Sequence, residues 1–289
     1  MNTFGATYPQ GPVPYPRTMF SKPQLDRYSR QLILPGVGAA GQQRLLEAKV
    51  LVVGAGGLGS PILLYLAAAG VGTLGVVDDD VVELSNLQRQ IVHSGGTLGR
   101  GKVTSAAARL GDLNPEVRVE PFATRLRAGN ALELLRPFDL IVDGSDTLPT
   151  RYLLSDACVL LGKPLLYGAM SQFEGQLSLL HAPTAAGRGP CYRCVYPGPP
   201  PPNTVLSCAE GGVFGALPGV IGSLMAVEVI KYLVGLGESS QKLTHYDALT
   251  GGFHTVKLRR NPACPSCGDA PSIRSLEEHE DYEAFCGVI

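Results

Sequence analysis

The segment that most limits the possible fold is a short apolar run followed by a glycine-rich loop. Residues 49–53 (KVLVV) read as a buried strand that leads into GAGGLG at residues 54–59 and then into an apolar, helix-compatible stretch. In a strand–loop–helix unit, such glycines let the backbone approach a phosphate, and the helix N-terminus attracts its charge. Tight packing of strand on helix would also select glycine, but the whole context favours a nucleotide site. The residues expected to bind the nucleotide are Gly54, Gly56, Gly57 and Gly59.

Strands and helices alternate through the first half of the chain. Strands are predicted at 49–53, 73–77, 117–122 and 139–142, and helices at 62–69 and 101–113. Beyond about residue 163 the predicted strands are shorter, at 165–169, 176–180, 243–246 and 254–258, with one long helix at 218–234. The first pattern is typical of a parallel sheet covered by helices, with ligands at the carboxyl ends of its strands. We therefore expect an α/β fold: a Rossmann-like doubly wound sheet, parallel in the N-terminal half and continued by antiparallel strands in the C-terminal half.

The chain divides into three segments by composition. Residues 1–24 are rich in Pro, Gly, Tyr and Ser without apolar periodicity, which predicts a mobile N-terminal arm. Residues 25–268 contain every motif discussed below and are expected to form the main domain. Residues 269–289 form a C-terminal tail with an acidic stretch.

Composition and charge exclude several classes of function. The net charge of -1 and the pI near 6.5 argue against nucleic-acid binding. The longest apolar stretches, 61–77 and 211–227, are marginal for a bilayer span and are interrupted by glycines, and the N-terminus has no secretion-signal pattern. We therefore expect a cytoplasmic protein without membrane contact. Charged residues make up only 17%, against about 25% in typical domains, which suggests a surface buried between subunits.

The charged residues after the glycine loop distinguish between nucleotides. A redox dinucleotide needs no cation at a terminal phosphate, whereas cleavage of ATP does, because charge develops on the departing oxygens. Arg89, within SNLQRQ at residues 85–90, and Lys102 would neutralise a triphosphate, and Asp146 at a strand end could hold Mg²⁺. Asp78, which ends the second strand, could accept from the ribose of either NAD or ATP. Each of these charges alone is more often a solvated surface group, but together they favour ATP.

The seven cysteines include two CxxC pairs. Four thiolates suit a tetrahedral, closed and therefore structural Zn²⁺ site, and a redox pair is the alternative for either motif alone. Cys158 lies in an apolar stretch and is expected in the core, Cys286 has no evident partner, and Cys208 is ambiguous. The four predicted zinc ligands are Cys191, Cys194, Cys264 and Cys267.

An ordered set of motifs between Arg27 and Gly268 resembles the ThiF/MoeB/HesA family, relatives of the ubiquitin-activating enzymes. The set comprises RYSRQ at 27–31, GAGGLG, Asp78 and Asp80, SNLQRQ, Gly101-Lys102, and Asp143 to Asp146. The resemblance implies that ATP and Mg²⁺ are used to adenylate the C-terminal glycine carboxylate of a small ubiquitin-fold sulfur carrier, releasing pyrophosphate. It also supports zinc at the cysteine pairs.

The resemblance assigns roles residue by residue. Asp78 resembles the ribose ligand and Asp80 falls in the same nucleotide-binding motif. Phosphate-contacting residues are matched by Asn86, Arg89 and Lys102, and the metal-associated aspartate by Asp146. Arg30 resembles an arginine that reaches the triphosphate of the neighbouring subunit, which implies a homodimer. Cys208 stands where relatives place a cysteine that can attack the acyl adenylate, although some relatives do not need it. Thr147 departs from the family, which often has Asn there.

Other functions and partners remain open from the sequence. An NAD-dependent oxidoreductase would explain the glycine loop and Asp78 but not SNLQRQ or Lys102. A non-catalytic scaffold, like the inactive half of an activating-enzyme pair, is disfavoured because Arg30, Arg89, Lys102 and Asp146 occur in one chain. We expect a separate sulfurtransferase as the sulfur donor. The carrier could belong to molybdopterin, thiamine or tRNA-thiolation chemistry.

Overall fold

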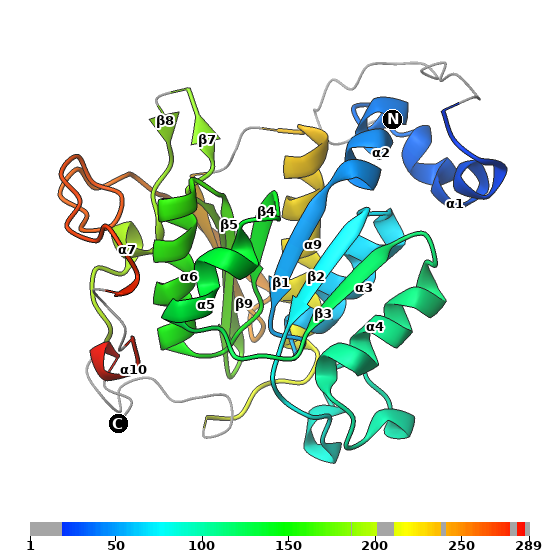
Figure 1. Cartoon of the computed structure of the whole chain (residues 1–289), viewed down its shortest axis with the longest axis horizontal. Helices are drawn as coiled ribbons and strands as arrows, with labels where there is room; N and C mark the ends of the chain where they lie inside the picture. Colours follow the sequence, from blue (N-terminus) through cyan, green and yellow to red (C-terminus); the bar gives the residue numbers. More distant parts are fainter. Residues whose placement is uncertain (1–18, 186, 201–210, 238–240, 278–281, 287–289) are drawn as a thin grey trace.

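An eight-stranded mixed sheet, in the order β10-β9-β6-β5-β4-β1-β2-β3, runs through the centre of the protein (Figure 1). The structure is a computed structural model that describes residues 19–185, 187–200, 211–237, 241–277 and 282–286. The strands are β1 (Lys49–Val53), β2 (Thr73–Val77), β3 (Arg118–Phe122), β4 (Leu140–Asp143), β5 (Leu165–Ser171), β6 (Glu174–Leu180), β9 (Lys242–Asp247) and β10 (Gly252–Lys257). A separate two-stranded ribbon is formed by β7 (Pro183–Thr184) and β8 (Gly187–Arg188).

The sheet changes from parallel to antiparallel at β5. Strand β1 pairs in parallel with both β2 and β4, and the parallel pattern extends to β3 and β5. Strands β6, β9 and β10 then add in antiparallel order. The predicted fold class is therefore confirmed. Because the parallel strands all end at one edge, the loops after β1, β2, β3 and β4 meet there.

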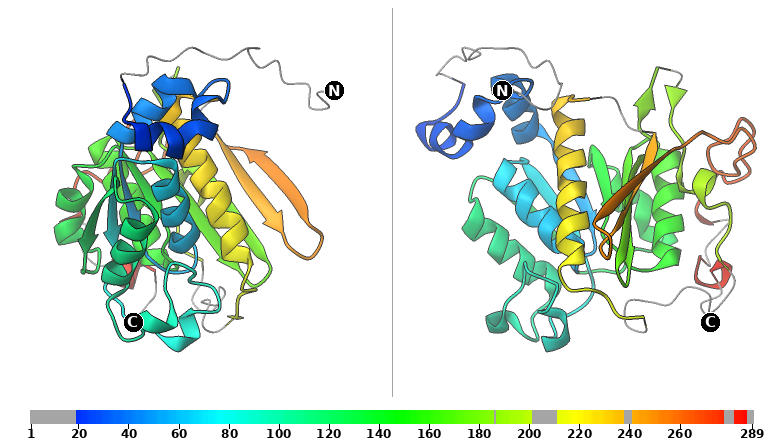
Figure 2. Two further views of the ribbon diagram at one scale, coloured as in Figure 1. Left: turned by 90° about the vertical axis from the view of Figure 1, so that its right-hand side faces the viewer. Right: turned by 180° about the vertical axis from the view of Figure 1, so that it is seen from behind.

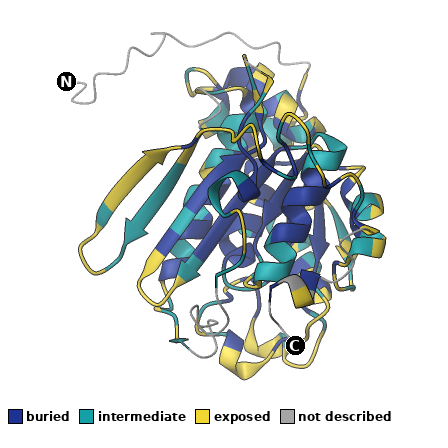
Figure 3. Ribbon diagram, turned by 90° about the vertical axis from the view of Figure 1, so that its left-hand side faces the viewer, coloured by how far each residue is buried: buried dark blue, intermediate teal, exposed yellow. Residues whose placement is uncertain are grey.

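Helices cover both faces of the parallel part. The α-helices of the described residues are α1 (Lys22–Leu32), α2 (Gly38–Glu47), α3 (Gly59–Ala69), α4 (Lys102–Leu113), α5 (Ala128–Leu135), α6 (Leu148–Leu161), α7 (Tyr192–Val195), α9 (Leu217–Val234) and α10 (Tyr282–Phe285). Val50 and Val52 of β1 pack into one core with α2, α3, α4 and α9, while Leu51 and Val53 pack into the other with α5 and α6. This alternation is the side-chain period of a strand buried on both faces, and Figure 3 shows the buried sheet between the helices.

Helix α9 lies against the antiparallel part of the sheet, beside α3 (Figure 2). Among the described helices it alone has the length and apolar character to cross a membrane, with 18 residues and a mean hydropathy of 1.6. Its packing against α2, α3, β5 and β6 accounts for that apolar composition, as expected for a core helix. Beyond it, the β9–β10 hairpin extends away from the body of the protein (Figure 2), and its β10 side chains are mostly exposed.

Some described residues of the predicted arm and of the predicted tail belong to helices or to the core. Helix α1 begins at Lys22, inside the predicted arm, because Ser21 forms a capping box with Gln24 and Pro23 suits the first turn. At the other end, Leu276, Tyr282 and Cys286 of the predicted tail are buried in the core that contains α6.

Candidate functional site

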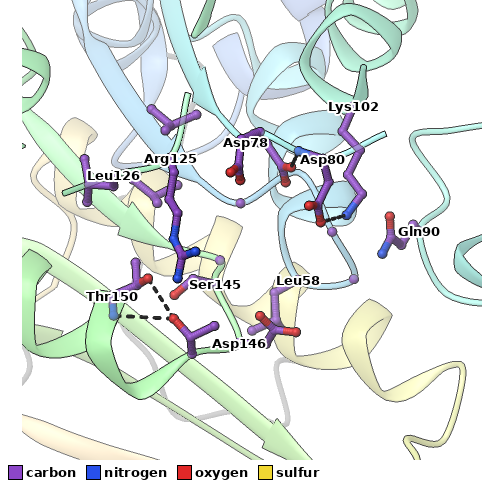
Figure 4. A pocket seen from close by; sticks show the side chains of 18 of the residues that line it. Leu58, Asp78, Asp80, Gln90, Lys102, Arg125, Leu126, Ser145, Asp146 and Thr150 are labelled. Carbon is purple, nitrogen blue, oxygen red and sulfur yellow. Dashed lines mark hydrogen bonds and ion pairs between the residues drawn. The ribbon is translucent and has the colours of Figure 1, made fainter. Parts of the chain in front are cut away.

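A cavity of about 300 Å³ opens at the carboxyl ends of the parallel strands. The glycine loop forms its floor, as Figure 4 shows, and the segments after β2, β3 and β4 form its walls. Its lining includes Gly54, Gly56 and Gly57, together with the charged residues Asp78, Asp80, Arg89, Lys102 and Asp146. The structure thus brings most of the predicted nucleotide-site residues into one cavity.

The glycine loop is too tightly folded for side chains at two positions. Gly54 has a φ of +95°, and a Cβ there would lie 2.7 Å from the carbonyl oxygen of Gly144. A Cβ on Gly59, the first residue of α3, would lie 1.9 Å from the carbonyl oxygen of Gly54. Glycine is therefore required for β1 to turn sharply into α3, and the turn presents backbone N–H groups to the cavity.

Asp78 fixes the glycine loop to the end of β2. One carboxylate oxygen, Oδ2, accepts the Ala55 N–H at 2.8 Å, and the other, Oδ1, accepts the Asp80 N–H at 2.9 Å. The carbonyl oxygen of Ala55 is held from the opposite side by His93 Nε2 at 2.9 Å. Asp78 therefore shapes the loop as well as facing the cavity.

His93 is a functional candidate that the sequence reasoning missed. Its other ring nitrogen, Nδ1, lies 2.9 Å from Ser105 Oγ on α4, so the buried ring joins the glycine loop to the helix that carries Lys102. Burial, and secondarily the charge of Lys102, lower the pKa of His93. A neutral ring that donates from Nε2 to Ala55 suits these contacts. Its closeness to SNLQRQ in the chain was the only available signal.

The two predicted phosphate-binding cations both line the cavity. Lys102 is buried at the start of α4, and its Nζ lies 2.7 Å from Asp80 Oδ2 (Figure 4). Arg89 donates from Nη1 to the carbonyl oxygen of Ser85 at 3.1 Å. Asn86 does not line the cavity: its side chain accepts the Glu83 N–H at 3.1 Å and contacts Ser85, so it stabilises the turn before Arg89.

Two carboxylates of different character lie at the end of β4 and just after it, and only the second, Asp146, lines the cavity. Asp143 is fully buried, and its Oδ1 accepts from the N–H and the hydroxyl of Ser145 at 3.0 and 2.6 Å. Burial raises the pKa of Asp143 to about 6, although the charge of Arg151 opposes the shift. Asp146 is exposed and stands just before Thr147, the N-cap of α6. An exposed carboxylate at this edge suits a hydrated cation such as Mg²⁺.

Arg125 and Arg151 also line the cavity, and the sequence reasoning missed both. Arg125 follows β3, and in Figure 4 its guanidinium extends toward Ser145 and Asp146. The rule that ligands bind after parallel strands would have identified this loop. Arg151 lies one helical turn after Thr147, and its guanidinium sits 5.8 Å from the centre of the Tyr167 ring.

Arg30 does not belong to the cavity of its own chain. It is exposed on α1, which is anchored by Arg27 to the carbonyl oxygen of Leu113 at 2.9 Å and by Gln31 to that of Ala69 at 3.2 Å. Those carbonyls lie at the last residues of α4 and α3, the two helices that begin at the cavity. A 12-residue helix is about 18 Å long, so Arg30 stands at the opposite end of the sheet from the cavity.

The four predicted zinc ligands converge into one cluster. The Sγ–Sγ separations are 3.9 Å for Cys191–Cys194, 3.5 Å for Cys191–Cys264 and 3.4 Å for Cys194–Cys267. Tetrahedral Zn²⁺ with bonds of about 2.3 Å separates its sulfurs by about 3.8 Å. Hydrogen bonding to Cys191 lowers the pKa of Cys194, and a bound metal would hold the sulfurs as thiolates. The cluster therefore fits the group that the spacing predicted.

A buried ion pair ties the cysteine cluster to α6. Arg193, between the first two cysteines, binds both carboxylate oxygens of Asp156, with its Nη2 at 2.8 Å from Oδ2. The hydroxyl of Tyr282 donates to the same Oδ2 at 3.0 Å. Among the other cysteines, Cys158 is buried in the core as predicted, and Cys286 is buried next to α6. Cys208 lies outside the described residues.

Comparison with known proteins gives matches both to a family and to individual relatives in sequence. A model of the ThiF family matches residues 28–266. The chain is 57% identical over 271 residues to a sulfur carrier protein adenylyltransferase of Thermus thermophilus, covering 93% of this chain and 99% of that protein. It is 53% identical over 281 residues to the adenylyltransferase and sulfurtransferase MOCS3 of Bos taurus, covering 96% of this chain but 60% of the relative.

Two further comparisons agree with these. A probable adenylyltransferase/sulfurtransferase MoeZ of Mycobacterium tuberculosis is 47% identical over 279 residues, which cover 96% of this chain and 69% of the relative. In structure, the chain resembles E. coli MccB crystallised with AMPCPP and MccA, with a TM-score of 0.74 and 23% identity over 84% of this chain and 74% of that one. At this identity the structural likeness concerns the fold.

Proposed function

This chain belongs to the ThiF family, and from that membership we propose that it is an adenylyltransferase that uses ATP to activate the C-terminal carboxylate of a small sulfur carrier protein. Its relatives are named as adenylyltransferases, one of them of a sulfur carrier protein. The product of the proposed step would be an acyl adenylate ready for sulfur transfer. An NAD-dependent oxidoreductase and a non-catalytic scaffold are both less consistent with these relatives.

The observation that carries the proposal is the arrangement of charge in one cavity. The glycine loop and Asp78 suit the phosphates and ribose of any nucleotide. Lys102 and Arg89 add two cations on the side of the cavity after β2, where a departing pyrophosphate would need them. This charge pattern matches cleavage of ATP between its α- and β-phosphates, and hydride transfer has no use for it.

The reaction follows from these positions. A carboxylate oxygen of the carrier attacks the α-phosphorus of ATP, the new P–O bond forms, and the bond to the β-phosphate breaks, releasing pyrophosphate. The attacking carboxylate is ionised at neutral pH and needs no base, so the protein acts by positioning and by charge stabilisation. Asp146, exposed on the wall of the cavity, would hold Mg²⁺, which when bound would offset phosphate charge.

Zinc at the cysteine cluster has a structural role in this proposal. All four sulfurs lie within 4.8 Å of one another and leave no ligand position open for a substrate. A covalent role for Cys208 stays a prediction, and so does a separate sulfurtransferase. The chain spans 60% of the length of bovine MOCS3, which is named as both an adenylyltransferase and a sulfurtransferase.

A homodimer would complete the cavity with Arg30 of the second subunit. The exposed position of Arg30 at the far end of the sheet supports this, because its own cavity is out of reach. Two exposed apolar side chains, Ile33 and Leu34, lie just after Arg30 in the chain. A second exposed apolar surface lies in the segment between β2 and α4 that carries Arg89, and it comprises Val81, Leu84, Ile91 and Leu98. Two-fold pairing of these two surfaces would form a closed dimer.

The test is exchange of labelled pyrophosphate into ATP. We expect exchange only when a carrier ending in Gly-Gly is present, with the acyl adenylate detected by mass spectrometry. The matched control is the same carrier lacking its last glycine. Absence of exchange with carriers of the molybdopterin, thiamine and tRNA-thiolation types would contradict the proposal. Reduction of a nicotinamide cofactor would instead favour the oxidoreductase.

A further inference from the structure

Arg151 occupies the wall of the cavity that faces away from Lys102. In the sheet, β1 and its glycine loop lie between β2, which leads toward Lys102, and β4, which leads into α6 and Arg151. Figure 4 shows this separation, with Lys102 and Asp80 on one side of the glycine loop and Asp146 and Thr150 on the other. The two cations therefore approach a bound nucleotide from opposite sides.

The guanidinium of Arg151 lies beside the Tyr167 ring and retains a hydrogen-bond donor that the described residues do not satisfy. Its Nε is sealed from solvent and has no hydrogen-bond partner in the described residues. Asp143, behind this wall at the end of β4, also has a buried oxygen, Oδ2, without a hydrogen-bond partner in the described residues. Although burial opposes the charge, Tyr167, Asp143 and their neighbours raise the pKa of Arg151, so it stays cationic. Leaving the Arg151 donor unpaired in a buried site is costly, and an acceptor such as a carboxylate would satisfy it.

In-line geometry identifies which part of the substrates reaches this wall. The leaving pyrophosphate is drawn toward Lys102 and Arg89, so the attacking oxygen must enter on the opposite side of the α-phosphorus. That side is the wall after β4. The attacker is a carboxylate approaching an anionic phosphate, and the repulsion between them must be offset by a cation. A guanidinium matches a carboxylate with two parallel donors.

We propose that Arg151 binds the C-terminal carboxylate of the incoming carrier and holds it against the α-phosphate of ATP. This inference rests on the proposed function and adds the residue that recognises the nucleophile. Arg125 also extends into the cavity, but it is exposed and therefore better solvated. The competing explanation is that Arg151 only offsets the buried charge of Asp143.

The experiment measures recognition of the carboxylate directly. Binding of a Gly-Gly-ending carrier and of the same carrier with a C-terminal carboxamide is compared by calorimetry, with α,β-methylene ATP present so that no reaction occurs. Wild-type protein should bind the carboxylate form at least about ten-fold more tightly than the carboxamide. Arg151→Gln should bind the two forms with equal affinity while its affinity for the ATP analogue is unchanged. Arg136→Gln, an exposed arginine at the end of α5, is the matched control and should keep the preference.

A second variant separates the two explanations. If Arg151 only neutralises Asp143, the double variant Asp143→Asn/Arg151→Gln, which removes both charges, should regain the preference for the carboxylate, and this result would overturn the proposal. We expect the double variant to bind the carboxylate and carboxamide carriers with equal affinity. The double variant also tests the proposal if Arg151→Gln alone does not fold. A preference that survives in Arg151→Gln, or disappears only in Arg125→Gln, would also overturn it. Wild-type protein without carrier-dependent exchange would instead refute the proposed function.

Discussion

Lys102 Nζ lies 2.7 Å from Asp80 Oδ2, so the buried cation of the cavity is already paired before any nucleotide binds. The pairing is uneven, because the Lys102 side chain is 8% exposed and that of Asp80 67% exposed. The backbone repeats the contact, since the Lys102 N–H donates to the Asp80 carbonyl oxygen at 2.9 Å. Asp80 thus holds Lys102 in position for a phosphate, from the solvent side.

Asp80→Asn tests this pairing. The variant should lower the free energy of unfolding of the nucleotide-free protein by about 1 kcal/mol or less, because the lost partner is mostly solvated. ATP should restore more stability in the variant than in the wild type, since its phosphates would then pair with a free Lys102. Thermal melting with and without ATP measures both effects. Asp79→Asn, next along the chain and exposed, is the control for stability; equal losses in both variants would show that the pair contributes nothing.

Arg89→Ala and Lys102→Ala should each slow carrier-dependent pyrophosphate exchange by about 100-fold or more, as expected when a group that stabilises developing charge is removed. The loss should appear mainly in kcat, because the charge develops on the departing pyrophosphate. The exposed Arg136→Ala should exchange at the wild-type rate. Normal exchange in both cavity variants would remove these two residues from the mechanism.

Mixed dimers can show that Arg30 acts across subunits. Arg30→Ala and Lys102→Ala proteins should each be inactive alone. After subunit exchange, a heterodimer has one cavity with an intact Lys102 that receives Arg30 from the other chain. Random mixing should therefore restore about one quarter of wild-type exchange activity. Mixtures that stay as inactive as the separate variants would exclude a shared site.

Removal of zinc should destabilise the C-terminal part of the protein. Metal analysis should find one zinc per chain, and chelation or Cys264→Ser should lower the free energy of unfolding by several kcal/mol, on the order of 3 or more. Cys158→Ala provides a control, because it removes a buried thiol outside the cluster and should leave the zinc content unchanged. A zinc-free protein with unchanged melting would disprove a structural metal.

The raised pKa of Asp143 predicts that this residue lowers the free energy of unfolding as the pH rises. Its folded-state pKa of about 6 exceeds the ordinary value of 3.8 for an aspartate, so between these pH values the folded state retains a proton that the unfolded state releases. The contribution of Asp143 to the free energy of unfolding therefore falls as the pH rises from about 4 to 6 and stays low at higher pH. The total loss is roughly 3 kcal/mol at most. Asp143→Asn should be more stable relative to wild type at pH 7 than at pH 4. Urea unfolding at both values measures this, and a pH-independent difference would contradict it.

The parts of the fold that follow from local patterns could be predicted from the sequence. The glycine loop requires a sharp turn between strand and helix, and the buried strands and α9 have clear apolar runs. The two CxxC motifs predict a four-sulfur site without knowledge of the fold that joins them. Helix α5, which is short and starts with small and polar residues, was not predicted.

The contacts that depend on packing could not be predicted. Asn86 was expected at the phosphates, but its side chain turns inward to the Glu83 N–H. His93 gains its position from Ala55 and Ser105, which are far from it in the chain. In the sequence, nothing distinguishes Arg151 from an ordinary surface arginine of a helix. Its environment is created by Tyr167 and Asp143, which only the fold brings close to it. Each case depends on neighbours that only the folded sheet supplies.

The ion pair between Asp156 and Arg193 has a consequence for the order in which the protein matures during synthesis. Asp156 is translated 37 residues before Arg193, and Cys191 is translated 73 residues before Cys264. A nascent chain therefore contains Asp156 before its ion-pair partner exists, and half of the cysteine cluster before the other half exists. Zinc could join all four sulfurs only after Cys264 and Cys267 have been made, and it would then fix the segment that carries Arg193 beside α6.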